Sequence, residues 1–118
     1  MNKFLAAVAL AVLGGMSINP AVAADLANGR TIIERSNCAA CHGPGLAKPV
    51  SGEYPKLAGQ YADYTYFALR AYQAGNTNPM FGRDNVVMRA QVQSLSEADL
   101  RDVAAYIQSL PSDLVQQK

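Results

Sequence analysis

One short segment holds both cysteines and the only histidine of the 118-residue chain: Cys38-Ala39-Ala40-Cys41-His42. Two thiols three positions apart lie on one turn of a helix, so both can bond to one group beside that turn. The pattern C-x-x-C-H is typical of covalent c-type haem attachment, in which each thiol adds to a vinyl group and the histidine binds the iron. We therefore predict that Cys38 and Cys41 attach one haem c and that His42 is the proximal ligand of its iron.

Three other chemistries fit these residues less well. A thioredoxin-like redox pair needs a βαβ pattern, and the sequence has no alternating or β-branched run that predicts a strand. Two thiols and one imidazole could supply three zinc ligands, but no further Cys or His exists to complete a structural zinc site. A disulfide between Cys38 and Cys41 is compatible with an oxidising compartment, but it leaves His42 unexplained.

The opposite face of the iron needs a ligand from elsewhere in the chain. A second histidine is excluded because His42 is the only one, so a methionine thioether is the expected donor. Beyond residue 23 the methionines are Met80 and Met88, and both fall in or beside a segment predicted to be a loop. We expect the ligand to reach the haem from a loop rather than from a packed helix. The alternatives are a five-coordinate iron and, for either methionine, filling a gap in the core.

The first 23 residues predict a cleavable export signal. Lys3 gives a positive start, residues 4–13 are an unbroken run of ten apolar residues, and Ala21-Val22-Ala23 has the small-x-small pattern of a cleavage site. Ten apolar residues are about half of the roughly 20 that span a bilayer. We therefore predict cleavage after Ala23, or after Ala24, and a periplasmic domain over residues 24–118 that is not embedded in a membrane.

The composition of residues 24–118 predicts one small domain that depends on its cofactor. Nine basic and nine acidic side chains balance with no basic run, so no nucleic-acid partner is indicated. Leu, Ile, Val and Phe make up 19 of the 95 residues, close to the level below which chains fail to fold on apolar content alone. Small domains of this kind are usually stabilised by a cofactor, a metal or disulfides. The haem-free chain is expected to be largely unfolded.

Helical patterns surround the attachment motif. A short helix over residues 26–36 is predicted by a stripe with Ile32 beside it: Leu26, the stem of Arg30, Ile33 and Asn37. An Ala-rich and aromatic segment predicts a second helix that ends at Gly75 and Asn76. This second helix is predicted over residues 62–74. It lies between a predicted loop over residues 43–59 and a predicted loop over residues 76–87.

The clearest predicted helix lies near the C-terminus. Ser96 and Asp99 have the spacing of a capping box, with Asp in place of the usual Glu, and Leu95 and Leu100 are spaced as a hydrophobic staple. Apolar residues recur at helical intervals until Pro111 ends the run. The chain is thus predicted to be all-α, with three to four short helices and loops wrapped around one haem.

The sequence resembles the short bacterial class I c-type cytochromes and the lobes of dihaem bacterial cytochromes c. The resemblance covers the mature chain and implies the class I cytochrome c fold, with Tyr106 packed against Gly29 where the first and last helices cross. Its evidence is Gly29, the segment Cys38-Ala39-Ala40-Cys41-His42-Gly43-Pro44, the segment Tyr54-Pro55-Lys56-Leu57-Ala58-Gly59-Gln60, and the run from Met88 to Leu110.

The resemblance also implies roles for two residues outside the motif. Met88 stands eight residues before Ser96, the family's spacing from ligand to last helix, and is therefore the expected sixth ligand. Met80 competes with it, because a proline before the ligand methionine occurs in related cytochromes. Pro55 aligns with the proline whose carbonyl accepts a hydrogen bond from the proximal histidine.

With both axial positions filled, no site is open to oxygen or substrate, so the chain is expected to be an electron carrier and not an enzyme. Its expected partners are periplasmic or membrane-bound redox proteins (an oxidase, a reductase or a dehydrogenase), and it is expected to be a monomer. The alternatives are a haem enzyme or gas sensor with a displaceable methionine, and a cytochrome subunit fixed in a larger oxidoreductase complex.

Two further groups of side chains have no single predicted role. Tyr61, Tyr64, Tyr66 and Tyr72 are expected to cover an edge of the cofactor rather than to conduct electrons. Three basic residues could pair with the haem propionates, and the sequence singles out none of them: Lys56, Arg70 and Arg83.

Overall fold

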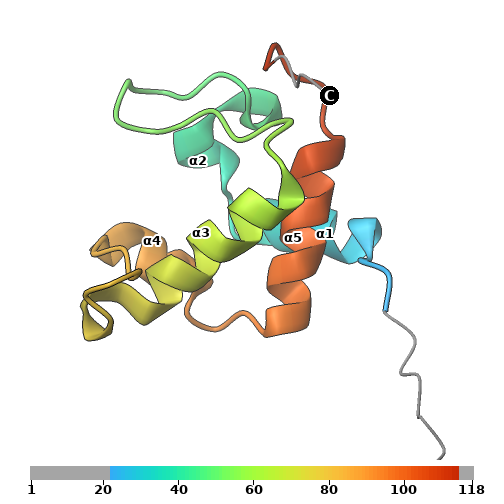
Figure 1. Ribbon diagram of the computed structural model, residues 1–118. Helices are drawn as coiled ribbons and strands as arrows, with labels where there is room; N and C mark the ends of the chain where they lie inside the picture. The colour runs from blue at the N-terminus through green and yellow to red at the C-terminus, as the bar shows by residue number, and fades with distance from the viewer. Residues whose placement is uncertain (1–21, 115–118) are drawn as a thin grey trace, which may run out of the picture.

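The computed structural model of the chain describes residues 22–114 (Figure 1). The predicted export signal lies outside this range except for its last two residues, and it stays a prediction. Within the range, the chain forms α-helices and short 3-10 turns and no strands, which confirms the all-α prediction, and no helix is long and apolar enough to cross a membrane. The elements are α1 (Leu26–Arg35), α2 (Ala39–His42), η1 (Pro44–Leu46), α3 (Ala62–Ala74), η2 (Gly75–Thr77), α4 (Val86–Val92) and α5 (Glu97–Ser109).

One of these helices, α4, was not predicted, and with the single turn of α2 counted as a helix the expected three to four helices become five. The attachment motif itself forms the single turn of α2, and the predicted second loop ends early because α4 begins at Val86. Helix α4 starts there because Asn85 caps it: Oδ1 of Asn85 accepts a hydrogen bond of 3.0 Å from the N–H of Met88.

The core forms where α1 and α5 cross, and α3 packs against α5 (Figure 1). Leu100 is completely buried, and Ile32 is 3% exposed. At the crossing, Gly29 of α1 lies against Tyr106 of α5, as the resemblance implied. The other buried apolar side chains of these two helices are Ile33, Val103, Ala104 and Ile107.

The predicted buried face of α1 was right for Ile33 and for Ile32 beside it, and wrong for Leu26 and Arg30. Leu26 is 47% exposed and the side chain of Arg30 is 64% exposed, whereas Gly29, Ile32 and Ile33 are buried. The stripe was misplaced because glycine carries no apolar side chain and so gives no periodic signal. Its contact with α5 nevertheless decides which face turns inward.

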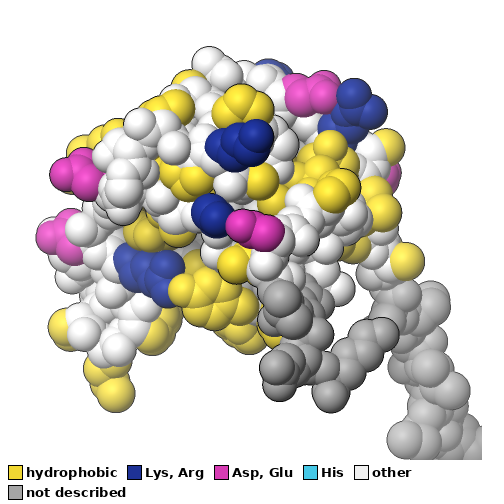
Figure 2. Space-filling view, turned by 90° about the horizontal axis from the view of Figure 1, so that it is seen from above, with side chains coloured by type: hydrophobic (Ala, Val, Ile, Leu, Met, Phe, Trp, Pro, Cys, Tyr) yellow, Lys and Arg dark blue, Asp and Glu magenta, His cyan; other side chains and the backbone are white. Residues whose placement is uncertain are grey.

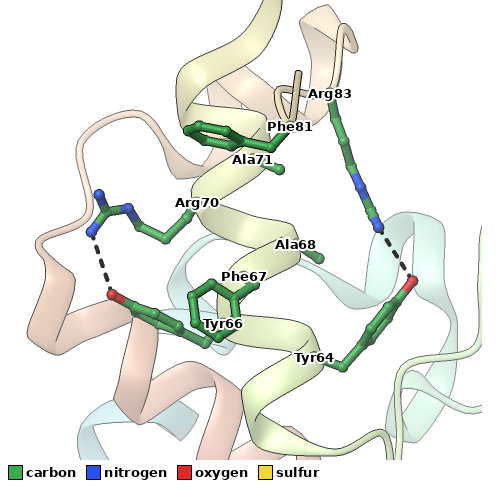
Figure 3. Close-up of a pocket in the computed structure, with 8 residues that line it drawn as sticks. All are labelled: Tyr64, Tyr66, Phe67, Ala68, Arg70, Ala71, Phe81 and Arg83. Atoms are coloured by element: carbon green, nitrogen blue, oxygen red, sulfur yellow. Dashed lines mark hydrogen bonds between the residues drawn. The ribbon is translucent and has the colours of Figure 1, made fainter. Parts of the chain in front are cut away.

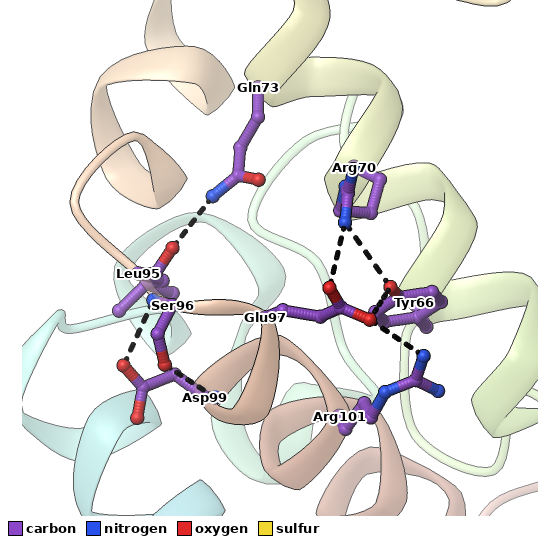
Figure 4. Close-up of polar contacts among 8 residues, drawn as sticks. All are labelled: Tyr66, Arg70, Gln73, Leu95, Ser96, Glu97, Asp99 and Arg101. Carbon is purple, nitrogen blue, oxygen red and sulfur yellow. Dashed lines mark hydrogen bonds and ion pairs between the residues drawn. The ribbon is translucent and has the colours of Figure 1, made fainter.

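The capping box of α5 is confirmed (Figure 4). Oγ of Ser96 accepts a hydrogen bond of 3.1 Å from the N–H of Asp99, and the carboxylate of Asp99 accepts one of 3.0 Å from the N–H of Ser96. This main-chain hydrogen bond is the largest of the contacts that lower the pKa of Asp99. Helix α5 therefore begins at a fixed position.

Polar contacts tie α3 to the start of α5 and to the turn before it (Figure 4). The buried Tyr66 donates its hydroxyl hydrogen to Glu97 at 2.9 Å. Two guanidinium groups flank the same carboxylate, Arg101 at 2.8 Å and Arg70 at 3.4 Å.

The side-chain amide of Gln73 donates to the carbonyl groups of Val92 and Leu95, at 2.8 and 2.9 Å. These bonds hold α4 beside α3.

Candidate functional site

The attachment motif follows α1 through a sharp change of backbone direction. Asn37 has a φ of 52°, a left-handed conformation that Asn tolerates better than most residues and that ends α1. The next residues start a new turn, in which the N–H of His42 donates to the carbonyl of Cys38 at 3.0 Å. Cys38 and Cys41 carry free thiols and are partly exposed. Burial is the main cause that raises the pKa of Cys38, so this thiol is protonated at neutral pH in the polypeptide.

His42 is buried and held in one orientation. It is 6% exposed, and its Nδ1 lies 2.9 Å from the carbonyl oxygen of Pro55, the contact that the resemblance implied. A carbonyl oxygen only accepts hydrogen bonds, so Nδ1 is the donor in this contact and Nε2 is the ring nitrogen left to bind a metal. The ring of Tyr54 stands edge-on, its centroid 6.3 Å from that of the imidazole. A hydrogen bond from Nδ1 to a carbonyl orients an imidazole for binding a metal through Nε2.

A cavity of about 600 Å³ opens beside the motif, within the roughly 300–1,000 Å³ range of cofactor sites. Cys38, Cys41 and His42 lie on its wall together with Met88 of α4. Much of the remaining wall is the apolar core itself, contributed by α1, α3, α4 and α5: Ile32, Ile33, Leu69, Val92, Val103 and Ile107.

The two candidate methionines lie in different surroundings. Met88 is partly buried on the cavity wall, whereas Met80 is 93% exposed and is not among the residues that line the cavity. The expectation that the ligand lies in a loop does not hold for Met88, which stands in the first turn of α4. One side of this seven-residue helix nevertheless faces the cavity, since Gln91 and Val92 of α4 also line the cavity.

The residues around the cavity fit a haem group. A c-type haem needs two thiols for covalent attachment, with an imidazole and a thioether as ligands of the iron, and all four side chains border one space. Within residues 22–114 no group of three or more His, Cys, Asp or Glu is placed to hold a metal ion, so the zinc alternative finds no ligand set there.

Sequence reasoning missed Thr65 as a residue of this cavity. Thr65 is 4% exposed, lines the cavity, and its Oγ1 has no hydrogen-bond partner among the described residues. A buried hydroxyl without a partner is rare in a finished structure, so its place on this wall fits a site that a bound group completes. One threonine in a helix gives no signal in the sequence, and only its burial shows it.

A second, more exposed cavity of about 540 Å³ lies on the outer side of α3 (Figure 3). It shares Tyr64, Ala68 and Arg83 with the first cavity, so these three residues form a common wall. Phe67 and Phe81 line it and are 67% and 62% exposed. Elsewhere, basic and acidic side chains are scattered among apolar ones on the face shown in Figure 2.

Comparison with known proteins agrees with this geometry. The model of the family described as Cytochrome c matches residues 26–111. Cytochrome c-554(548) of Halomonas halodenitrificans is 40% identical over 75 residues, which are 61% of this chain and 82% of that protein.

Two longer proteins match over part of their length. Cytochrome c4 of Stutzerimonas stutzeri is 39% identical over 62% of this chain. The thiosulfate dehydrogenase electron acceptor of Thiomonas intermedia is 36% identical over 65% of this chain. The matched segments are 34% and 33% of those proteins, so the chain spans about a third of their length. With a single attachment motif and one family model across most of its length, this chain belongs to the cytochrome c family, as a class I c-type cytochrome with one covalently bound haem c.

Proposed function

We propose that the chain is an electron-transfer protein whose haem is bound by His42 and Met88. The observation that carries this proposal is that both side chains border one cavity, from two different helices. When bound, the haem iron supplies a one-electron change between its ferrous and ferric states. Two protein ligands leave no iron position for oxygen or a substrate, so electron exchange is the chemistry that remains.

The chain's own residues account for the other requirements of this function. Cys38 and Cys41 keep the cofactor from being lost, and Pro55 fixes the imidazole of His42 through its carbonyl oxygen. The apolar wall keeps water from the iron, which disfavours the extra charge of the ferric state. Met88 as a ligand acts in the same direction, since a thioether raises the reduction potential.

The same proposal includes a compartment and a class of partner. Cleavage after Ala23 would release residues 24–118 into the periplasm as a monomer, and cleavage after Ala24 would release residues 25–118. Its partners would be other exported or membrane-bound redox proteins, and one relative's name describes that protein as the electron acceptor of a dehydrogenase. With balanced charges, the rate of electron transfer would depend only mildly on salt.

Absorbance spectra of the exported protein, oxidised and reduced, with and without carbon monoxide, test this function. We expect low-spin, six-coordinate spectra in both states and no change of the reduced spectrum with carbon monoxide. His42→Ala is the control that should prevent a stable six-coordinate haem. A high-spin reduced spectrum that carbon monoxide shifts would favour the sensor or enzyme alternative instead.

A further inference from the structure

The charges on the wall of the haem cavity are few. Among the described residues that line it, Arg83 is the one Lys or Arg and Glu53 the one Asp or Glu. A haem brings two propionate carboxylates to such a site. A carboxylate that is partly removed from water needs hydrogen-bond donors or a cation beside it. Arg83 is placed to supply both.

The other basic residues that the sequence offered for this role already have partners. Nζ of Lys56 lies 2.9 Å from the carboxylate of Asp113. Arg70 points to the outer side of α3, where it contacts the hydroxyl of Tyr66 at 3.3 Å (Figure 3). It also lies 3.4 Å from the carboxylate of Glu97 (Figure 4). Neither residue lines the haem cavity.

Arg83 has no such partner, although its position is fixed. No carboxylate within residues 22–114 lies at ion-pair distance from it. Its Nη2 donates to the hydroxyl of Tyr64 at 3.3 Å (Figure 3), and its guanidinium lies 5.8 and 5.3 Å from the ring centroids of Tyr64 and Tyr72. Its main-chain N–H donates to the carbonyl of Ala71 at 2.9 Å.

These contacts hold a planar donor group at the cavity wall. Tyr64 and Tyr72 also line the cavity, so the cation and both rings border the same space. An arginine held on aromatic rings keeps further N–H groups for a ligand, and its fork matches the two oxygens of a carboxylate. The hydrogen bonds to Tyr64 and Tyr72 raise the pKa of Arg83, so the guanidinium keeps its charge.

We propose that Arg83, held by Tyr64 and Tyr72, is the residue that pairs with a haem propionate and that its charge raises the reduction potential. This inference rests on the haem site proposed above. A cation near the iron opposes the added charge of the ferric state. Removing the cation ends this opposition, and it also leaves the propionate unpaired, which favours ferric haem. Both effects of the removal lower the reduction potential.

The test measures the reduction potential of the holoprotein for the wild type, Arg83→Gln, Arg83→Lys and Arg70→Gln. We expect Arg83→Gln to shift the equilibrium about tenfold toward ferric haem, which is about 59 mV for a one-electron couple. Arg83→Lys keeps the charge but not the planar fork and should recover part of this change. Arg70→Gln removes the same charge from the outer side of α3 and should shift the equilibrium much less. Equal shifts in Arg83→Gln and Arg70→Gln, or no shift in either, would overturn the assignment.

A second measurement reports on the propionate itself. The carboxylate band in the infrared difference spectrum between the two redox states should move in Arg83→Gln and stay in place in Arg70→Gln. If Arg83→Gln does not retain haem, Tyr64→Phe removes one anchor of the guanidinium and should lower the potential by a smaller amount. A carboxylate band that does not move in Arg83→Gln would also overturn the assignment. If Arg83→Gln loses haem, an unchanged reduction potential in Tyr64→Phe would overturn it. The ferric iron–thioether band of the wild type tests ligation by methionine separately, so the two proposals can fail independently.

Discussion

Gly29 of α1 lies directly against the main-chain carbonyl group of Asp102 in α5. A Cβ atom at position 29 would overlap this carbonyl and would lie 3.0 Å from Cβ of Tyr106. The side-chain amide of Asn28 donates to the carboxylates of Asp99 and Asp102, at 3.1 and 2.8 Å. The crossing of the two helices is therefore fixed by close backbone contact and by hydrogen bonds. This crossing positions the apolar residues of α1 that line the haem cavity.

Gly29→Ala is expected to lower the free energy of unfolding by about 1–3 kcal/mol, because the added methyl group forces the two helices apart. Denaturant unfolding of the holoprotein measures this. Gly52→Ala is the matched control, since a Cβ at position 52 meets no atom within 4 Å and should change stability by less than about 0.5 kcal/mol. Equal unfolding midpoints for the two variants would contradict the close contact.

The parts of the fold that sequence predicted are those with local signals. The helix over residues 62–74 has the predicted bounds, and Ser96 begins the last helix through the predicted capping box. Helices α2 and α4 have only four and seven residues, too few for a periodic pattern, and of the two only α4 begins at a side-chain cap, Asn85. The inward face of α1 depends on Gly29, which gives no periodic signal and whose contact with Tyr106 only the resemblance implied.

The candidate site divides in the same way. Cys38, Cys41 and His42 are neighbours in sequence, so their spacing alone predicts a shared chemistry. Residues that reach the cavity from other elements carry no such signal, and Arg83 could not be told apart from the chain's other basic residues until its partners were known. The preference for Met88 over Met80 likewise rested on resemblance, and the structure adds that Met88 lines the cavity whereas Met80 is exposed.

Met88→Ala is expected to abolish the weak long-wavelength band of ferric iron bound to a thioether sulfur, and to lower the reduction potential. Absorbance spectroscopy and a redox titration of the ferric protein measure both. Met80→Ala is the control, because its side chain is 93% exposed and does not line the cavity. Survival of the band in Met88→Ala, with its loss in Met80→Ala, would transfer the role to Met80.

Acid should destabilise the protein through Asp99. Its pKa is lowered in the folded state, chiefly by the hydrogen bond from the N–H of Ser96, so the unfolded state binds more protons as the pH falls. The stabilisation is complete above the unfolded pKa of about 3.9 and is lost as the pH falls through the lower, folded value. Denaturant unfolding from about pH 6 to pH 3 should therefore show a steeper loss of stability in the wild type than in Asp99→Asn.

Asp84→Asn is the matched control for that series, since Asp84 makes no hydrogen bond or ion pair with a described residue. Its stability should follow the wild-type pH dependence. If Asp99→Asn kept the full wild-type slope, the capping carboxylate would not be the source of the acid sensitivity.

Removing the haem should unfold the chain, because the walls of the haem cavity are also the core. A cavity left in a protein interior costs about 24 cal/mol per Å³, so about 600 Å³ corresponds to an upper bound on the order of 14 kcal/mol, reached only if water does not enter. This is as large as the roughly 5–15 kcal/mol by which domains are stable. The variant Cys38→Ala/Cys41→Ala, purified without haem, should show far-ultraviolet circular dichroism close to that of a denatured chain. Native-like helical dichroism with a cooperative thermal transition in this haem-free variant would instead mean that the contacts between α1 and α5 hold the fold without the cofactor.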